Sequence, residues 1–178
     1  MRKEELAYIA KQTSLAYIAG FLDGDGCIML QLVSRKDYIL GYQIRASIVF
    51  YQKQKYRSFL EEIKEKLKYG YIRERNDGIV EYTIVGFEPV KKILTLLYPY
   101  LKLKKQQAKL ALEVIEKIPK EVRLPKRTKL SAELLMELSY EVDKFASLNY
   151  SKRRTNTSAQ VKEFLISHNL LNPVETDP

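Results

Sequence analysis

The chain has 178 residues, 46% of them apolar, so one domain spanning residues 1–178 with a substantial core is expected. Its 31 lysines and arginines outnumber 22 acidic residues, and the net charge of +9 favours a polyanionic partner, nucleic acid first, although lysine-rich surfaces are often only solvated. A single cysteine excludes an internal disulfide, no apolar run reaches the ~18 residues of a membrane span, and we expect neither a signal peptide nor a transit peptide.

Residues 15–23 are predicted to form a helix, because their apolar side chains recur at helical spacing. The members of that face are Leu15, Ile18, Ala19 and Leu22. Ala16, Gly20 and Gly24 stand four apart on a second face, where small residues permit the close approach of another backbone. Asp23 and Asp25 end the helix at the negative pole of its dipole, where Mg²⁺ or Ca²⁺ would stabilise them. A solvated helix end also explains the two acids, and this pattern alone favours that reading over a metal site.

Beyond Gly26 the apolar residues alternate, which predicts strands over 27–35 and 42–50. A helix over 53–68 and two strands around the turn Asn76-Asp77-Gly78 follow, and then helices near 88–98 and 103–118 on either side of Pro99. The order helix, strand, strand, helix, strand, strand, helix predicts an α+β fold: an antiparallel four-stranded sheet with helices on one face.

The other face of this sheet is too polar for a core and carries groups able to read base edges. Its members are Met29, Gln31, Val33, Arg35, Gln43, Arg45, Ser47, Arg73, Arg75, Glu81 and Thr83.

A basic segment with two prolines, 119–131, is predicted to link the core, about 12–118, to a C-terminal helical part over 132–171. Two apolar faces at helical spacing predict the helices of that part: Leu134, Leu135, Leu138, Val142 and Phe145 in the first, and Val161, Phe164 and Leu165 in the second. Lys152, Arg153 and Arg154 lie between them, and a phosphate contact is favoured over a solvated turn.

The stretch LAYIAGFLDGDG, residues 15–26, resembles the signature of the LAGLIDADG homing endonucleases over ten or more consecutive positions. The chain is most similar to the homodimeric branch of that family, which is found in chloroplast group I introns. The shared features are the presence of one motif and not two, the order of elements, the NDG hairpin and PYLKLKKQQAKLAL (99–112). The similarity extends over nearly the whole chain, to about residue 166.

The resemblance implies an αββαββα fold with a saddle-shaped sheet, and an intron-encoded, site-specific endonuclease that hydrolyses double-stranded DNA with Mg²⁺, in a site that Mn²⁺ or Ca²⁺ can also occupy. It implies no small-molecule cofactor and no membrane. Asp25 would ligate the metal together with the Gly24 carbonyl, and Asp23 would brace the helix end. Gln52 would position the attacking water, and Lys104 would lie near the scissile phosphate; paired metals supply this chemistry without a histidine.

Two copies would meet through Ala16, Ala19, Gly20 and Asp23, so that a lone acid from each forms a shared site. The target would be a pseudo-palindrome of about two helical turns, roughly 20 base pairs. Contacts to it are expected from the polar sheet face, from Tyr38 for the outer bases and from Lys152, Arg153 and Arg154. The resemblance implies an organelle, the chloroplast first, with the mitochondrion and the prokaryotic cytoplasm as alternatives.

One departure concerns Tyr56, which stands where relatives carry a basic residue four positions beyond the glutamine. Two rival functions on the same fold are a splicing cofactor that binds intron RNA and a DNA-binding protein that does not cut. The joint presence of Asp25, Gln52 and Lys104 favours the endonuclease, because binding alone does not need that set.

Overall fold

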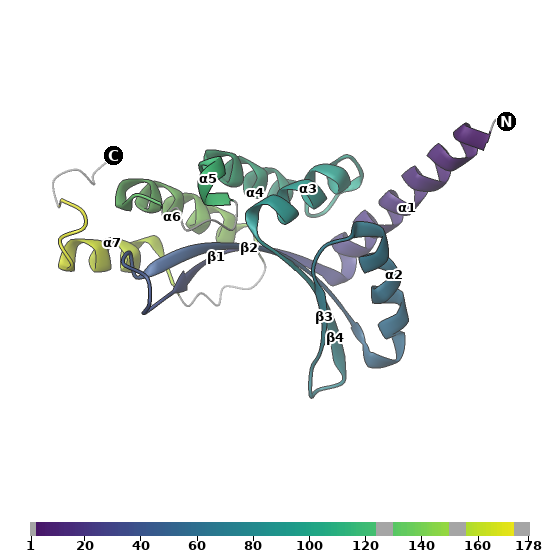
Figure 1. The fold of residues 1–178 in the computed structure, drawn as a ribbon, viewed down its shortest axis with the longest axis horizontal. Helices are drawn as coiled ribbons and strands as arrows, with labels where there is room; N and C mark the ends of the chain where they lie inside the picture. The colour runs from purple at the N-terminus through teal and green to yellow at the C-terminus, as the bar shows by residue number, and fades with distance from the viewer. Residues whose placement is uncertain (1–2, 124–129, 150–155, 173–178) are drawn as a thin grey trace.

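The computed structural model describes residues 3–123, 130–149 and 156–172 (Figure 1). Its main elements are α1 (Lys3–Asp25), β1 (Gly26–Ser34), β2 (Tyr42–Lys53), α2 (Arg57–Leu67), β3 (Tyr71–Glu74), β4 (Ile79–Val85), α3 (Phe87–Leu97), α4 (Lys105–Lys117), α5 (Lys120–Arg123), α6 (Ala132–Ser147) and α7 (Ser158–Ser167). The 3-10 helices η1 (Gln54–Tyr56) and η2 (Tyr98–Tyr100) precede α2 and follow α3, the second at the predicted break. The predicted αββαββα order is confirmed.

The four strands form one antiparallel sheet in the order β1-β2-β4-β3. Its inner face carries the alternating apolar residues predicted from the sequence, and Ile28, Ile48, Phe50, Tyr82 and Ile84 are at most 1% exposed. Figure 1 shows α3, α4 and α6 lying above β1 and β2, and these helices supply the rest of the core.

Helix α1 begins twelve residues earlier than predicted, at Lys3 rather than Leu15. Its N-terminal half projects from the body of the molecule (Figure 1), which leaves Tyr8 and Ile9 exposed. Because this half meets no core, it lacks the apolar face by which a helix is recognised, although its Ala, Glu, Lys and Leu residues favour a helix by intrinsic propensity.

The predicted linker 119–131 contains one helical turn, the four residues of α5, and its residues 124–129 lie outside the described residues. The C-terminal helices α6 and α7 are confirmed, and each has a polar N-cap. The Ser131 hydroxyl accepts from the Leu134 N–H at 3.2 Å, and Thr157 and Gln160 form a capping box. Across the three described ranges no helix is long and apolar enough to cross a membrane.

Candidate catalytic centre and nucleic-acid interface

The two acids at the end of α1 have different environments. Asp23 is only 8% exposed, and its carboxylate accepts hydrogen bonds from three successive backbone N–H groups, of Lys102 at 2.7 Å, Leu103 at 3.1 Å and Lys104 at 2.9 Å. These amides immediately precede α4, where a negative charge is favoured by the helix dipole. Asp23 therefore braces the end of α1, as predicted, and it does so against the segment before α4 of its own chain. Because it has almost no exposed surface, the prediction that it also lies in a dimer interface is not supported by this chain.

Asp25 is the last residue of α1 and is exposed. Within the part of the chain that the structure describes, no group of three or more His, Cys, Asp or Glu side chains could hold a metal ion. Asp25 and the helix-end carbonyls are hard oxygen donors that suit Mg²⁺ or Ca²⁺, so the donor type fits such an ion. One chain therefore contributes one carboxylate, which is half of what a paired-metal site requires.

Lys104 reaches the same helix end. Its Nζ donates a hydrogen bond to the Asp23 carbonyl, which places an ammonium group at the negative end of the α1 dipole. Lys104 is also close enough to Cys27 to lower the pKa of that thiol, but burial raises that pKa by more. The thiol is therefore protonated near neutral pH, which agrees with its prediction as a strand residue and not as a nucleophile.

Gln52 lies at the end of β2, two residues beyond Phe50, which pairs with Gly26. Gln52 therefore lies at the end of the sheet where β1 begins, directly after α1. The side chain is half-buried, and its Oε1 accepts from the Lys53 N–H at 3.0 Å. Asp25 and Lys104, which are far apart in the sequence, thus meet at the end of α1, and Gln52 lies on the strand that pairs with the first residue after this helix.

Packing within the chain does not require glycine at positions 20 and 24 of α1. A Cβ added at Gly20 or Gly24 would meet nothing within 4 Å in the structure, whereas one at Gly26 would lie 2.6 Å from the Leu22 side chain. Ala16 is exposed on the same face. Ala19 is 0% exposed and belongs to the core, so its predicted role in a dimer interface is wrong.

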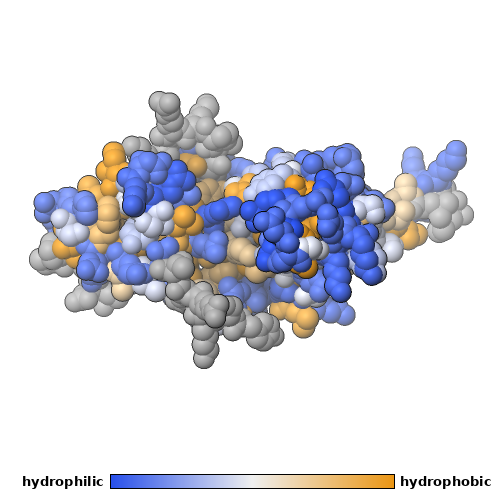
Figure 2. Space-filling model, turned by 90° about the horizontal axis from the view of Figure 1, so that it is seen from below, coloured by the Kyte–Doolittle hydropathy of each residue, from blue (hydrophilic) through white to orange (hydrophobic). Residues whose placement is uncertain are grey.

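The outer face of the sheet carries the predicted polar residues, because the register sets Gln31 opposite Arg45, Met29 opposite Ser47 and Val33 opposite Gln43. Figure 2 shows the underside of the molecule, where hydrophilic side chains predominate. Ser47 and Thr83 are nearly buried there, at 3% and 7% exposure, and offer little surface.

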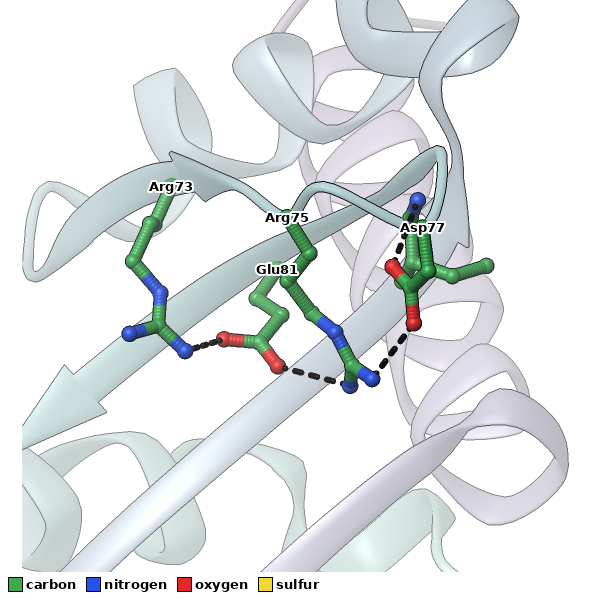
Figure 3. Close-up of polar contacts among 5 residues, drawn as sticks. Arg73, Arg75, Asp77 and Glu81 are labelled. Carbon is green, nitrogen blue, oxygen red and sulfur yellow. Dashed lines mark hydrogen bonds and ion pairs between the residues drawn. The ribbon is translucent and has the colours of Figure 1, made fainter.

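Four charged residues of the β3–β4 hairpin form one cluster (Figure 3). Glu81 accepts from Arg73 at 2.7 Å and from Arg75 at 3.2 Å, and Arg75 also donates to Asp77 at 2.6 Å. The hydrogen bonds to Glu81 and then to Asp77 raise the pKa of Arg75. The cluster balances two guanidinium groups with two carboxylates. Both oxygens of Glu81 accept from arginines, so a contact between Glu81 and a base would compete with these two ion pairs.

Tyr38 and Arg35, two further residues predicted to contact DNA, lie in the segment that joins β1 to β2. Tyr38 does not extend outward but is half-buried against the core, and Ile39, 62% exposed, is the outward residue beside it. Arg35 lies past the end of β1 and forms an ion pair with Asp37 at 2.8 Å. Lys152, Arg153 and Arg154 lie outside the described residues.

Tyr51 was not predicted as a residue of the outer face. The sequence predicted the second strand to end at Phe50, whereas β2 continues to Lys53. Tyr51 pairs with Glu81 on the outer face, and burial, followed by the nearby Cys27 and Glu81, raises its pKa. The same alternation that identified Arg45 and Ser47 would have found it, had the strand been extended.

Residues 18–115 match the LAGLIDADG endonuclease family. The chain belongs to this family. DNA endonuclease I-CvuI of Chlorella vulgaris is 41% identical over 154 residues, which are 86% of this chain and 91% of that protein. DNA endonuclease I-CreI of Chlamydomonas reinhardtii is 36% identical over 153 residues, 86% and 89% of the two chains.

LAGLIDADG structures agree with the fold. The crystal structure of the homing endonuclease I-CvuI in complex with its target in the presence of Ca matches with a TM-score of 0.84 and 37% identity, over 92% of this chain and 99% of that one. A second I-CvuI complex, with the I-CreI target and Mg, gives a TM-score of 0.83. The archaeal endonuclease I-Vdi141I complexed with DNA, at 19% identity and a TM-score of 0.74, supports the fold alone.

Tyr56 stands where other members of the family carry a basic residue, and positively charged side chains surround it. Tyr56 is 49% exposed, and the Lys55 Nζ lies 4.8 Å from its ring centroid. Arg57 is bound to Glu61 at 2.8 Å and to Glu74, so its charge is already compensated. Lys53 and Lys55, both exposed, are the cations beside Tyr56 that face solvent.

Proposed function

We propose that this protein is a homodimeric, site-specific endonuclease that cuts both strands of a DNA target. The observation that carries the proposal is the exposed carboxylate of Asp25, at the end of a helix whose glycine face is open. In residues 3–123, 130–149 and 156–172 no group of three or more His, Cys, Asp or Glu side chains completes a metal site around it. Similarity to two DNA endonucleases, with 36% and 41% identity over most of the chain, supports the reaction type.

In this proposal Asp25 and the Gly24 carbonyl hold Mg²⁺, with Mn²⁺ or Ca²⁺ as substitutes. When bound, the ion lowers the pKa of water and compensates charge on the phosphate oxygens. Gln52, at the adjoining end of β2, hydrogen-bonds the attacking water and orients it. The Lys104 ammonium, held against the Asp23 carbonyl, faces the developing negative charge of the phosphate. Each protomer supplies one such set and cuts one strand.

The dimer would form along the exposed face of α1. Ile9, Thr13, Ala16 and Gly20 are all exposed and follow one another by four, three and four residues, the spacing of a seam between two helices that cross at about 20°. The Thr13 hydroxyl bonds to the Ile9 carbonyl at 2.9 Å, which satisfies it within the helix. Side-chain size increases from Gly20 to Ile9. Two helices that touch at Gly20 and diverge toward their N-termini would need such larger side chains to fill the widening space between them.

The outer face of each sheet would lie along the major groove and read about half of a pseudo-palindromic target. Structures of I-CvuI are complexes with DNA, which supports a duplex partner for this chain. We further propose that the protein is encoded by an intron of an organelle genome, the chloroplast first, since both relatives come from algae.

A selection from a randomised duplex library tests the function. With Mg²⁺, the wild-type protein should cut a defined set of related sequences of roughly 20 base pairs with two-fold symmetry. Asp25→Asn should bind the selected site with similar affinity but not cut it, and Glu62→Gln, which neutralises an exposed carboxylate on α2, is the control that should still cut. Binding of the wild type without cleavage would favour a DNA-binding regulator, and preference for intron RNA would favour the splicing cofactor.

A further inference from the structure

The loop between β1 and β2, residues 35–41, has a defined internal structure. The Arg35 N–H donates to the Gly41 carbonyl at 2.7 Å, and the Gly41 N–H donates to the Tyr38 carbonyl at 2.9 Å. Leu40 is buried and Tyr38 half-buried, while Ile39 faces solvent. The loop therefore presents a fixed tip of Lys36, Asp37 and Ile39 to the outside.

Helix α7 holds this loop through one aromatic side chain. The Phe164 ring lies so close to Gly41 that a Cβ there would come within 2.4 Å of its carbons, and Gly41 also has a φ of +66°, which disfavours any other residue. The Tyr42 ring lies nearly perpendicular to the same ring, with centroids 5.8 Å apart, and His168 stacks on it at 3.9 Å. Phe164 is thus enclosed by the last residues of the loop and by its own helix.

A polar contact fixes α7 on the same strand pair. The Asn156 Nδ2 donates to the Leu32 carbonyl at 2.9 Å. Since β1 is an edge strand of the sheet, its outer carbonyl groups have no neighbouring strand to bond. Segments 124 residues apart in the chain, Asn156 and Leu32, are joined here, so the position of the loop depends on the C-terminal helix.

The loop lies at the end of the molecule far from the catalytic centre. Strand β1 runs from Gly26, beside Asp25, to Ser34, and Figure 1 shows its far end next to α7 and away from α1. The eight steps between its first and last residue, at ~3.3 Å each, span roughly 26 Å, which corresponds to about 8 base pairs of a duplex that rises ~3.4 Å per pair.

We propose that Phe164 is a positioning residue for target recognition: it fixes the 35–41 loop so that the loop discriminates the base pairs about 8 steps or more from the centre of the site. This inference rests on the proposed function, because the loop meets DNA only if the outer face of the sheet does. Phe164 itself touches Gly41, Tyr42 and His168 and needs no contact with the nucleic acid.

The test compares Phe164→Ala with Phe164→Leu and with Glu163→Ala, an exposed control one residue away on α7. Cleavage of libraries randomised at inner or at outer base pairs gives the discrimination at each position, which in protein–DNA sites is of the order of tenfold per pair. We expect Phe164→Ala to reduce outer discrimination to about twofold and to leave inner discrimination within a factor of about two. Phe164→Leu should fall between, and Glu163→Ala should match the wild type.

Hydrogen exchange of the free protein provides a readout without DNA. In Phe164→Ala the N–H groups of Arg35 and Gly41 should exchange at least about tenfold faster, while those of β4 stay protected. If Phe164→Ala does not fold, Gly41→Ala perturbs the same contact from the loop side and should give the same outer-pair loss. Equal loss at inner and outer pairs, or unchanged outer discrimination, would overturn the inference and leave the proposed function intact. A wild type that cuts no DNA would overturn the proposed function, and the exchange rates would still decide whether Phe164 holds the loop.

Discussion

Asp23 and Asp25 are separated by one glycine, yet their replacement by alanine should have opposite effects. Asp23→Ala removes the acceptor of three backbone N–H groups in a buried place. Each charge-assisted bond contributes about 1.5–3 kcal/mol, but water admitted by the smaller side chain recovers part of the sum, so we expect a total loss of about 3–5 kcal/mol. For a chain of this length, 1 kcal/mol lowers the Tm by about 2–4 °C, so the Tm should fall by roughly 6–20 °C.

Asp25→Ala changes an exposed side chain, and the free energy of unfolding should stay within about 0.5 kcal/mol of the wild type. A small gain is expected if anything, because a carboxylate at the C-terminus of a helix is disfavoured by about 0.3–1 kcal/mol. Cleavage, in contrast, should be lost, since the proposed metal ligand is gone. Asp23→Ala, assayed well below its own Tm, should retain more cleavage than Asp25→Ala.

Thermal unfolding followed by circular dichroism measures the change in Tm for both variants. A chelator is present so that metal binding does not stabilise the wild type. Several protein concentrations are used because dimerisation also raises the Tm. Asp23→Asn, which keeps one acceptor oxygen, should unfold between Asp23→Ala and the wild type. An Asp23→Ala protein as stable as Asp25→Ala would refute the assignment of the bracing role to Asp23.

Three further changes probe the charged cluster, the α1 face and the core. Glu81→Gln releases positive charge on the outer face, so affinity for a scrambled duplex should rise and the dependence of log K on log salt should steepen by about 1; an unchanged slope would contradict the charge balance in Figure 3. Gly20→Leu should abolish the dimer but not the fold, because there is open space at that position, and a variant that still sediments as a dimer would count against the α1 seam. Burial raises the pKa of Tyr82, whose hydroxyl donates to the Tyr69 carbonyl at 2.6 Å, so the unfolded chain loses that proton first and stability should fall as pH rises above ~10. Tyr82→Phe should cost about 1 kcal/mol at neutral pH and flatten that fall in chemical denaturation; parallel pH profiles for the two proteins would disprove the role of this hydroxyl.

The fold could be predicted where a segment rests on the core. Alternation identified β1 and most of β2, and the 3.6-residue period identified α2, α3, α4 and the C-terminal helices. The N-terminal half of α1 was missed because a helix that projects from the body leaves no one-sided apolar pattern. The last three residues of β2 were missed because Gln52 and Lys53 interrupt the apolar alternation at the end of the sheet.

The candidate site was predictable only where its residues are adjacent in sequence. The spacing of Gly20, Gly24 and Asp25 is visible within two turns of helix. The partners of Asp23 lie 79 to 81 residues further along the chain, and they are backbone amides, which no side-chain pattern reports. Likewise, the pairing of Glu81 with two arginines depends on rotamers across a hairpin, so residues that look free to read bases in the sequence are already paired in the fold.

The strict alternation of β1 and β2 separates two kinds of constraint along the same few residues. Even-numbered positions from Ile28 to Leu32 in β1 and from Ile44 to Phe50 in β2 hold the core, and odd-numbered neighbours such as Gln31 and Arg45 face outward and support little of it. Under the proposed function, a lineage of such proteins could drift to new insertion sites by exchanging outward residues alone, while the fold and the cutting end of α1 were inherited unchanged.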